Sequence, residues 1–365
     1  MKKNRTSRIL FFCPLPPPIG GQALISEIVY MLIKPSILIN TNMKNKYLDN
    51  LRAIAQVLYY FLFYKIDLVY FTCTRSKVGA VKDIILLLLC RLRKVKVINH
   101  LHGNEIMDLF DNSLFSKIIL YAYRQIDTTI FVTNRQQELM PSSLTEMKKC
   151  VIPNCYDPVL ESVKRRIPET VGEINILFVS FLMKSKGILV ALDVFELIAN
   201  EYSDVSFHIA GEPLGDEYMA TAVIKEAFEK RLEVLKQACP GRFIYHGVVK
   251  GQEKIKLFES CDIFLFPTFF KTESFGLVNI EAMRTGNVVV TTNHNFLPDI
   301  VTKEEGILVE PQNTEETYKA VKHLIDNPEL MRAIQRHNME HAQNKYSPSA
   351  FERRIIDLFE SFNHN

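Results

Sequence analysis

Hydrophobic positions along this 365-residue chain fall into short apolar runs separated by longer segments with helical spacing. The runs are rich in Ile, Val and Phe and are apolar on both faces, which is typical of parallel strands covered by helices. In the first half we expect strands at Arg8–Cys13, Leu68–Phe71, Val95–His100, Thr128–Val132 and Lys149–Ile152. In the second half we expect strands at Ile174–Val179, Val205–Ala210, Phe243–Tyr245, Ile263–Phe266, Val288–Thr291 and Ile307–Val309. Helical spacing separates them, as over Ala23–Ile33, Val190–Asn200 and Thr314–Ile325.

The alternation predicts an α/β fold with two doubly wound, Rossmann-like domains, because it breaks only once. Residues 154–175 show no strand pattern and hold prolines and a run of basic residues, which is typical of a linker. We expect a first domain over 1–155, a linker over 156–174, a second domain over 175–345 and a helix over 346–365. A ligand crevice is expected outside the carboxyl ends of the strands.

Charge sharpens this division. The net charge is only +3, which argues against a strongly basic nucleic-acid binder. Residues 1–155, however, hold 21 Lys and Arg against 10 Asp and Glu, and the rest of the chain holds 23 against 31. A basic first half therefore precedes an acidic second half, and the first half is expected to meet something anionic.

Cysteines and apolar stretches favour a cytoplasmic protein. The seven cysteines are scattered without a C-x-x-C pair, so neither a disulfide framework nor a zinc site is indicated. Ile9–Cys13 follows basic residues, and we interpret it as a first strand rather than as part of a signal peptide. The stretches Ile84–Cys90 and Val57–Tyr64 are far shorter than the roughly 18 to 20 residues that cross a bilayer.

The densest chemical signal lies between residues 266 and 292. A predicted strand ends at Pro267, a polar loop follows, and Ser274-Phe275-Gly276 opens a helix that closes near Gly286. Free N–H groups and the helix dipole at such a start favour a phosphate or a sugar hydroxyl. Glu273 precedes the helix and Glu281 lies inside it. The alternative is that Glu273 caps the helix and Glu281 is simply solvated.

These residues resemble a known family. Glu273-Ser274-Phe275-Gly276, followed by Glu281-Ala282-Met283, is similar to the Glu-x7-Glu signature of retaining glycosyltransferase family 4, whose members have the GT-B fold. Further pieces follow in the family's order over nearly the whole chain: Gly20-Gly21, His100-Leu101-His102-Gly103, Val151-Ile152-Pro153-Asn154, Lys186-Gly187 and Gly306-Ile307-Leu308-Val309.

The resemblance implies roles for the second-domain residues. Lys186 would bind the diphosphate of a nucleotide sugar, where backbone dipoles also face the anion. Glu281 would bind the ribose hydroxyls, and Ser274 with the amides of Phe275, Gly276 and Leu277 would contact the sugar and the distal phosphate. Glu273 would contact the transferred sugar, where a carboxylate stabilises oxocarbenium-like charge. The alternative for Lys186 is a surface lysine.

First-domain residues receive acceptor-side roles. Gly20 and Gly21 would form a tight turn that leaves room for a diphosphate or an acceptor. His102 would bind the donor sugar or position the acceptor hydroxyl, so Glu273 and His102 are the candidate catalytic residues. The alternatives for His102 are a buried histidine bonded to the backbone, or a metal pair with His100, although no acidic cluster completes such a pair.

One departure from the family concerns the diphosphate. Ser180-Phe181-Leu182 stands where the family usually carries Gly-Arg-Leu, so the second cation is missing from its usual place. Lys184 could replace it, or backbone amides could hold the phosphates with Lys186 alone.

A basic cluster marks the first half of the chain. It comprises Lys44 and Lys46, together with Arg91, Arg93, Lys94 and Lys96 directly after the leucine-rich run Ile84–Cys90. A leucine-rich helix with a basic end could lie on an anionic membrane. The alternative is a buried crossover helix whose lysines are solvated. No nucleic-acid binding is expected, since aromatic residues are not interleaved with this charge.

The sequence therefore predicts a retaining GT-B enzyme that moves a hexosyl unit from a nucleotide diphosphate sugar to a glycan acceptor, which we expect to be a lipid-linked intermediate of surface polysaccharide synthesis. We expect no cofactor and no metal requirement, a cytoplasmic location at the inner face of the plasma membrane, and a C-terminal helix that crosses back onto the first domain. Two alternatives stay open: a nonhydrolysing sugar-nucleotide epimerase of the same fold, and a catalytically silent binding subunit.

Overall fold

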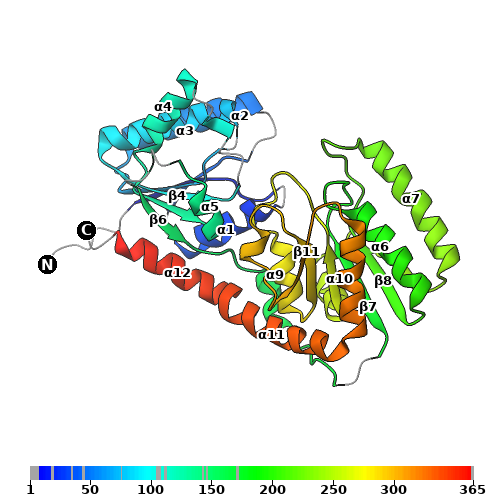
Figure 1. The fold of residues 1–365 in the computed structure, drawn as a ribbon. Coiled ribbons are helices and arrows are strands. Elements are labelled where there is room, and N and C mark those ends of the chain that lie inside the picture. The colour runs from blue at the N-terminus through cyan, green and yellow to red at the C-terminus, as the bar shows by residue number, and fades with distance from the viewer. Residues whose placement is uncertain are drawn as a thin grey trace. The chain divides into compact units, whose positions relative to one another are not determined.

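The structure is a computed structural model that describes residues 8–17, 20–33, 36–42, 46–74, 76–103, 108–110, 113–141, 144, 147–169 and 172–362. The chain forms two compact units (Figure 1). Unit 1 comprises Met1–Asn154 and Phe351–Asn365, and unit 2 comprises Cys155–Ala350.

Unit 1 is built on a parallel six-stranded sheet in the order β2-β1-β3-β4-β5-β6. Its strands are β1 (Ile9–Cys13), β2 (Ser36–Asn40), β3 (Leu68–Phe71), β4 (Lys96–Leu101), β5 (Thr128–Phe131) and β6 (Lys148–Val151). Its helices are α1 (Gly21–Leu32), α2 (Lys46–Phe63), α3 (Lys77–Arg93), α4 (Leu114–Tyr123) and α5 (Asn134–Glu138). The five strands expected in this half are present, each within one residue of its predicted bounds.

Strand β2 was not expected from the sequence. It lies at the edge of the sheet and pairs only with β1, with Phe11 opposite Leu38. Of its five residues only Ile39 is buried. An edge strand lacks the apolar pattern on both faces that identifies the central strands, which explains why the sequence pattern missed it.

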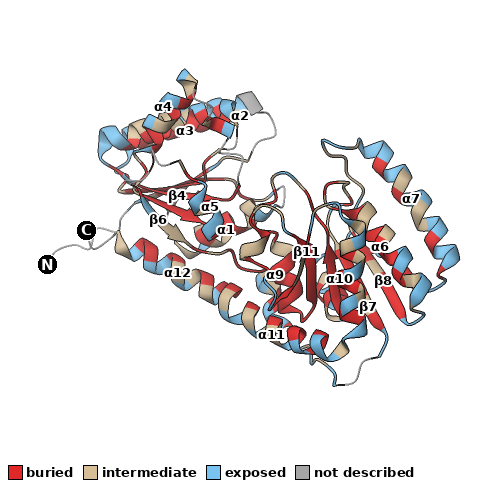
Figure 2. Ribbon diagram, in the orientation of Figure 1, coloured by how far each residue is buried: buried red, intermediate tan, exposed pale blue. Residues whose placement is uncertain are grey.

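Unit 2 repeats the architecture with the parallel order β12-β11-β10-β7-β8-β9. Its strands are β7 (Ile174–Val179), β8 (Val205–Ala210), β9 (Phe243–Tyr245), β10 (Ile263–Phe266), β11 (Val288–Thr292) and β12 (Gly306–Val309). Its helices are α6 (Ile188–Glu201), α7 (Thr221–Ala238), α8 (Gly251–Glu259), α9 (Leu277–Arg284), α10 (Thr314–Asp326) and α11 (Pro328–Tyr346). All six strands expected in this half are confirmed, and the strands are buried between helices (Figure 2).

The segment expected to be a linker is held by unit 2. It contains a short 3-10 helix, Pro158–Ser162, and then Arg165, whose side chain is largely buried. The Arg165 guanidinium pairs with Asp262 at 3.0 Å and also donates to the carbonyl of Thr285 at 3.1 Å. Arg332 of α11 binds the same Asp262 carboxylate at 2.9 Å. This charge network fixes residues around 165 against the amino end of β10, so they are part of unit 2.

The C-terminal helix α12 (Pro348–Ser361) returns to the first unit, as expected. Phe359 on α12 stacks on Phe11 of β1 with ring centroids 6.3 Å apart, and it lies 6.0 Å from the ring of Tyr70 on β3. Its apolar face thus completes the unit 1 core. A search of the described helices for one long and apolar enough to cross a bilayer finds none.

In each sheet, two neighbouring strands are followed in the chain by strands that lie on opposite sides of the pair. This position is the topological switch point. In unit 1 it lies between β1 and β3, and in unit 2 between β7 and β10. Ligands of open α/β sheets bind outside the carboxyl ends of the strands at such switch points. We therefore expect ligands to bind at these two switch points.

Candidate functional site

The switch point of unit 2 holds a buried ion pair. Lys186 follows β7 and Glu273 follows β10, and the Lys186 Nζ donates to the Glu273 carboxylate at 2.6 Å. Their side chains are only 14% and 10% exposed. The ammonium also lies 4.2 Å from the ring centroid of Phe270. A charge-assisted bond of this kind, largely out of water, fixes both side chains at the carboxyl edge of the sheet.

Gly187 allows the two loops to approach. Its φ is +84°, in the left-handed region that glycine adopts at no steric cost, and it is the N-cap of α6. A Cβ at this position would lie 2.2 Å from the carbonyl oxygen of Pro267, which follows β10. A side chain would push the Lys186 loop away from the Glu273 loop. The Lys186-Gly187 pair seen in the sequence therefore has a steric reason here.

A second ion pair lies in the same unit. Glu281 of α9 is 7% exposed, and its carboxylate accepts from the Nζ of Lys254 on α8 at 2.7 Å. Burial raises the pKa of Glu281 above its usual range, and the Lys254 ammonium opposes part of that rise. Sequence reasoning missed Lys254, because nothing in the spacing of α8 relates it to Glu281. That Lys184 replaces the missing diphosphate cation stays a prediction.

The start of α9 has no capping side chain. The helix begins at Leu277, directly after the predicted Ser274-Phe275-Gly276 turn, and no side chain caps its first N–H groups. Gly276 has φ +61°, and a Cβ there would lie 2.7 Å from the Nδ2 of Asn279. The Asn279 amide is fully buried, and it has no hydrogen-bond partner within the described ranges. A buried unsatisfied amide beside free N–H groups is suited to a polar ligand.

The plainer alternatives for this region are wrong. Glu273 does not cap α9, whose N-cap is Gly276. Glu281 is buried and ion-paired rather than solvated. Lys186 is likewise not a surface lysine. The structure thus brings Lys186 together with Glu273, and it places Glu281 with Lys254.

The histidines of unit 1 are buried at the carboxyl end of β4. The rings of His100 and His102 lie 4.0 Å apart, and the Tyr70 hydroxyl lies 2.7 Å from the His100 Nδ1. Burial, with His102 as a smaller influence, lowers the pKa of His100 well below its usual value, so His100 is neutral at pH 7. His102 directly follows the strand, where sequence reasoning placed a sugar or acceptor contact.

Neither histidine belongs to a cluster that could hold a metal. Within the described ranges, three or more candidate ligand atoms come together only at Glu305, His337 and His341, in unit 2. The metal-pair alternative for His100 and His102 therefore has no third ligand among these residues.

The glycine pair lies at the start of α1. Gly20 is the N-cap and Gly21 the first helical residue, and no side chain caps the helix. No acidic residue lies in its first turn, so the positive end of the helix is not neutralised locally. The pair therefore follows β1 at the switch point of unit 1, as the sequence predicts.

Comparison with known proteins identifies the domain. Residues 161–342 match the family described as Glycosyl transferases group 1, so the chain contains a domain of that family, and it falls within unit 2. An uncharacterized 41.2 kDa protein in the cps region of Klebsiella pneumoniae is 28% identical over 52% of this chain and 47% of its own. A phosphatidylinositol N-acetylglucosaminyltransferase subunit from Arabidopsis thaliana is 25% identical over 59% of this chain and 46% of its own length. The chain thus spans about half the length of these curated relatives.

Solved structures show the GT-B fold for the whole chain. A sucrose-phosphate synthase from Thermosynechococcus elongatus covers 98% of this chain and all of its own, with a TM-score of 0.69 and 16% identity. The structure of Anabaena HepE in complex with UDP aligns with 98% of this chain over 100% of its own chain, with a TM-score of 0.73 and 16% identity. The two six-stranded parallel sheets are those of GT-B glycosyltransferases.

Proposed function

We propose that this chain, with its group 1 glycosyltransferase domain, is a retaining family 4 enzyme that moves a hexosyl unit from a nucleotide diphosphate sugar to a lipid-linked glycan acceptor. The observation that carries the proposal is the Lys186–Glu273 pair at 2.6 Å, at the switch point of that domain. The acid and the base come from loops after neighbouring strands, so a diphosphate sugar bound there meets both.

Different parts of the donor would bind at the two ion pairs of unit 2. Lys186 has three N–H donors and can bind a phosphate while it keeps Glu273 in place. The N–H groups of Phe275, Gly276 and Leu277 at the start of α9 would face the distal phosphate and the sugar, beside Ser274. Glu281, held by Lys254, can accept two ribose hydroxyls.

The chemistry would follow from this placement. Breaking the bond between the sugar and the diphosphate leaves negative charge on the phosphate and positive charge at the anomeric carbon. Lys186 and the helix amides stabilise the first charge, and the Glu273 carboxylate stabilises the second. In this proposal the chain's own groups neutralise the diphosphate, without a metal. A neutral His100 behind His102 would leave His102 as the histidine that meets a sugar or acceptor hydroxyl.

An exposed apolar surface of unit 1 supports a lipid-linked acceptor. The leucine-rich run Ile84–Cys90 is a crossover helix, with Leu86, Leu87 and Cys90 in the core, so the buried alternative is right for it. Helix α2 instead has exposed large apolar residues at helical spacing, which we name the α2 face: Leu48, Leu51, Leu58, Tyr59, Leu62 and Phe63. Such a face, in a unit that also carries basic residues, suits the surface of an anionic bilayer. Of the basic cluster, Lys44 and the side chain of Lys46 lie outside what the structure describes.

Names of relatives point the same way. Besides the Arabidopsis protein, a Saccharomyces cerevisiae relative is named as a phosphatidylinositol N-acetylglucosaminyltransferase subunit, a name that includes a lipid. The Klebsiella relative is named for a cps region. We propose that this chain acts in surface polysaccharide synthesis at the inner face of the plasma membrane.

A thermal-shift screen with UDP, GDP and ADP tests the proposal first, because a ligand that binds the folded state raises its melting temperature. We expect one nucleotide to stabilise the protein. Incubation with the matching sugar and a lipid-linked acceptor should then give a glycosylated product that keeps the donor's anomeric configuration. An epimerised nucleotide sugar without transfer would instead identify the epimerase alternative, and binding without either product would identify the catalytically silent alternative.

A further inference from the structure

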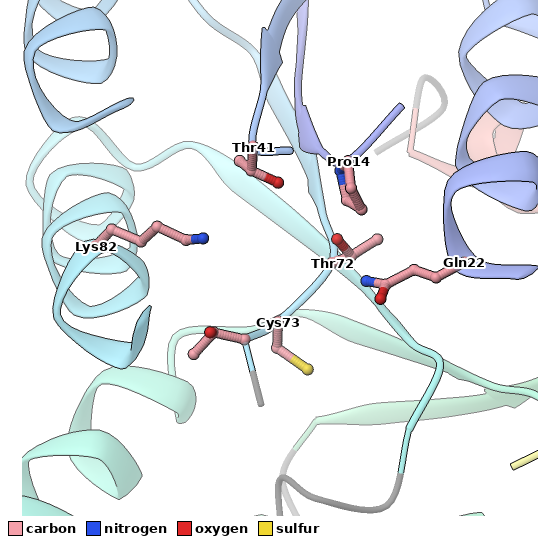
Figure 3. A pocket seen from close by; sticks show the side chains of 7 residues that line it. Pro14, Gln22, Thr41, Thr72, Cys73 and Lys82 are labelled. Carbon is pink, nitrogen blue, oxygen red and sulfur yellow. The ribbon is translucent and has the colours of Figure 1, made fainter. Parts of the chain in front are cut away.

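A polar pocket of about 160 Å³ lies at the switch point of unit 1 (Figure 3). Pro14 follows β1, Thr41 follows β2, and Thr72, Cys73 and Thr74 follow β3, so the pocket is formed where three parallel strands end. Gln22 from the first turn of α1 and Lys82 from α3 complete its lining. All of its lining residues belong to unit 1.

Lys82 gives this pocket a positive charge. The residue is only 6% exposed, and Figure 3 shows its side chain extending from α3 toward Thr72 and Gln22. Within the part of the chain that the structure describes, its ammonium has no hydrogen bond and no ion pair, and it lies 5.6 Å from the ring centroid of Phe12. Burial lowers the pKa of Lys82, and the nearby Asp83 carboxylate opposes only part of that effect. A bound anion would stabilise the buried ammonium further.

The neighbouring acid supplies only part of that counter-charge. Asp83 is fully buried, but its carboxylate accepts from the Thr74 N–H at 2.7 Å and from the Tyr123 hydroxyl at 3.2 Å. No Lys82–Asp83 ion pair forms within 4.0 Å, although both residues are described. Both bonds reach Oδ2, and Oδ1 has no hydrogen-bond partner among the described residues. Asp83 therefore offsets part of the Lys82 charge without forming an ion pair with it.

Hydroxyl and amide side chains line the same pocket as the ammonium. The Thr72 Oγ1 is buried and has no partner among the described residues. Gln22 stands in the uncapped first turn of α1, where free N–H groups and the helix dipole favour an anion. An ammonium, hydroxyls and a helix start together recognise phosphate, which has more acceptor oxygens than a carboxylate.

We propose that this pocket binds a phosphoryl group, and, resting on the proposed function, that the group is the phosphate by which the acceptor is attached to its lipid. The volume supports this assignment over the donor. Sites for whole drug-sized molecules occupy about 300 to 1,000 Å³, so the volume of this pocket suits a phosphoryl group better than a whole nucleotide. Gly20 and Gly21, which lie at the start of α1 beside Gln22, would then serve the acceptor.

The test compares three proteins: the wild type, Lys82→Met, and the control Lys117→Met, which removes the same charge from an exposed position on α4. Melting temperatures are measured with inorganic phosphate, with farnesyl diphosphate, with farnesol and with UDP. Thr72→Val serves as a second variant, because it removes one hydroxyl and no charge.

We expect inorganic phosphate at about 10 mM to raise the melting temperature of the wild type and of Lys117→Met by about 2 to 4 °C. Farnesyl diphosphate should act at lower concentration than farnesol. Lys82→Met should lose the phosphate response, Thr72→Val should weaken it, and both should keep the full response to UDP.

Two results would overturn the proposal. An unchanged phosphate response in Lys82→Met would show that the pocket binds no anion, and a lost UDP response would assign it to the donor. Failure of the proposed function is distinguishable, because the wild type would then respond to none of UDP, GDP and ADP while the phosphate response of unit 1 persisted.

Discussion

The two units carry a lysine near the same topological position, but they treat its charge differently. In unit 2 the switch point holds Lys186 against Glu273 at 2.6 Å. In unit 1 the switch point holds Lys82, buried and without an ion pair among the described residues. A paired lysine is compensated by its partner and can bind a ligand in addition, whereas a buried lysine without an ion pair gains more from a bound anion. The comparison indicates that the fold provides the position and the side chains nearby decide what is bound.

Net charge follows the same division. Residues 1–155 are basic in sum, and the remainder is acidic in sum. In the acidic half, Lys186 and Lys254 are each held by a buried glutamate, so a donor diphosphate would meet local cations within a domain of the opposite sign. The basic half instead holds Lys82, a buried cation without an ion pair among the described residues, which is consistent with an anionic acceptor.

The largest effect is expected at Glu273. In the proposed function, Glu273→Gln removes the charge that would face the transferred sugar but keeps the side-chain shape, and we expect transfer to fall by about 10³-fold. Nucleotide binding should change by less than about threefold, since Lys186 and the helix amides would hold the phosphates. Steady-state rates and titration calorimetry measure the two effects. An unaltered rate would remove Glu273 from the site.

The next effect separates the two lysines by stability. Lys186→Met leaves the Glu273 carboxylate buried without a partner and should cost about 3 kcal/mol of unfolding free energy. Lys82→Met removes a buried charge that has no ion pair among the described residues and should leave stability unchanged or higher. Urea unfolding measures both variants. The double variant Lys186→Met/Glu273→Gln should recover part of the loss, and equal costs for Lys186→Met and Lys82→Met would contradict the comparison.

Asp83 beside Lys82 should give unit 1 a pH dependence. Burial raises the pKa of Asp83 from 3.8 to about 6, against the opposing influence of Lys82. The folded state then holds this proton more tightly than the unfolded state, so stability falls as the pH rises from about 4 to about 6, by up to about 3 kcal/mol. Asp83→Asn should remove this fall while it retains the bonds to Thr74 and Tyr123. Unfolding curves at pH 4 and pH 7 measure it, and an identical slope in both proteins would contradict it.

The smallest effect concerns the α2 face. Leu62→Glu with Phe63→Glu places two acids on exposed positions, where folding should be unaffected. We expect binding to vesicles that contain phosphatidylserine to weaken by about tenfold or more, and wild-type binding to fall with added salt. Flotation measures both. Lys236→Glu on α7 of unit 2 is the control, and equal flotation of all three proteins would assign the basic half to another role.

Much of the fold could be predicted from the sequence. Central strands such as Ile263–Phe266 are apolar on both faces and were located with their bounds, whereas the half-exposed edge strand Ser36–Asn40 left no such signal. The segment around Arg165 resembled a linker because its prolines and charges are local features. Its attachment to unit 2 depends on Asp262, almost a hundred residues away in the chain.

The site divides in the same way. Lys186, Glu273 and Glu281 were found because each lies in a local motif beside a strand or a helix start. Lys254 and Lys82 were missed, because each sits in a helix whose pattern only indicates an amphipathic surface, and their burial arises from the packing of distant segments. The charge of a site is thus less predictable from one sequence than its glycines and glutamates.

Titration calorimetry with UDP, GDP and ADP on the wild type and Lys186→Met tests the central claim most directly, with Lys236→Met on the exposed surface of α7 as the matched control. The account predicts that one nucleotide binds the wild type and the control equally. Its dissociation constant should rise by about tenfold or more in Lys186→Met, as expected for the loss of a charge-assisted bond. Equal affinity in Lys186→Met and the wild type would contradict the assignment of the unit 2 switch point as the donor site.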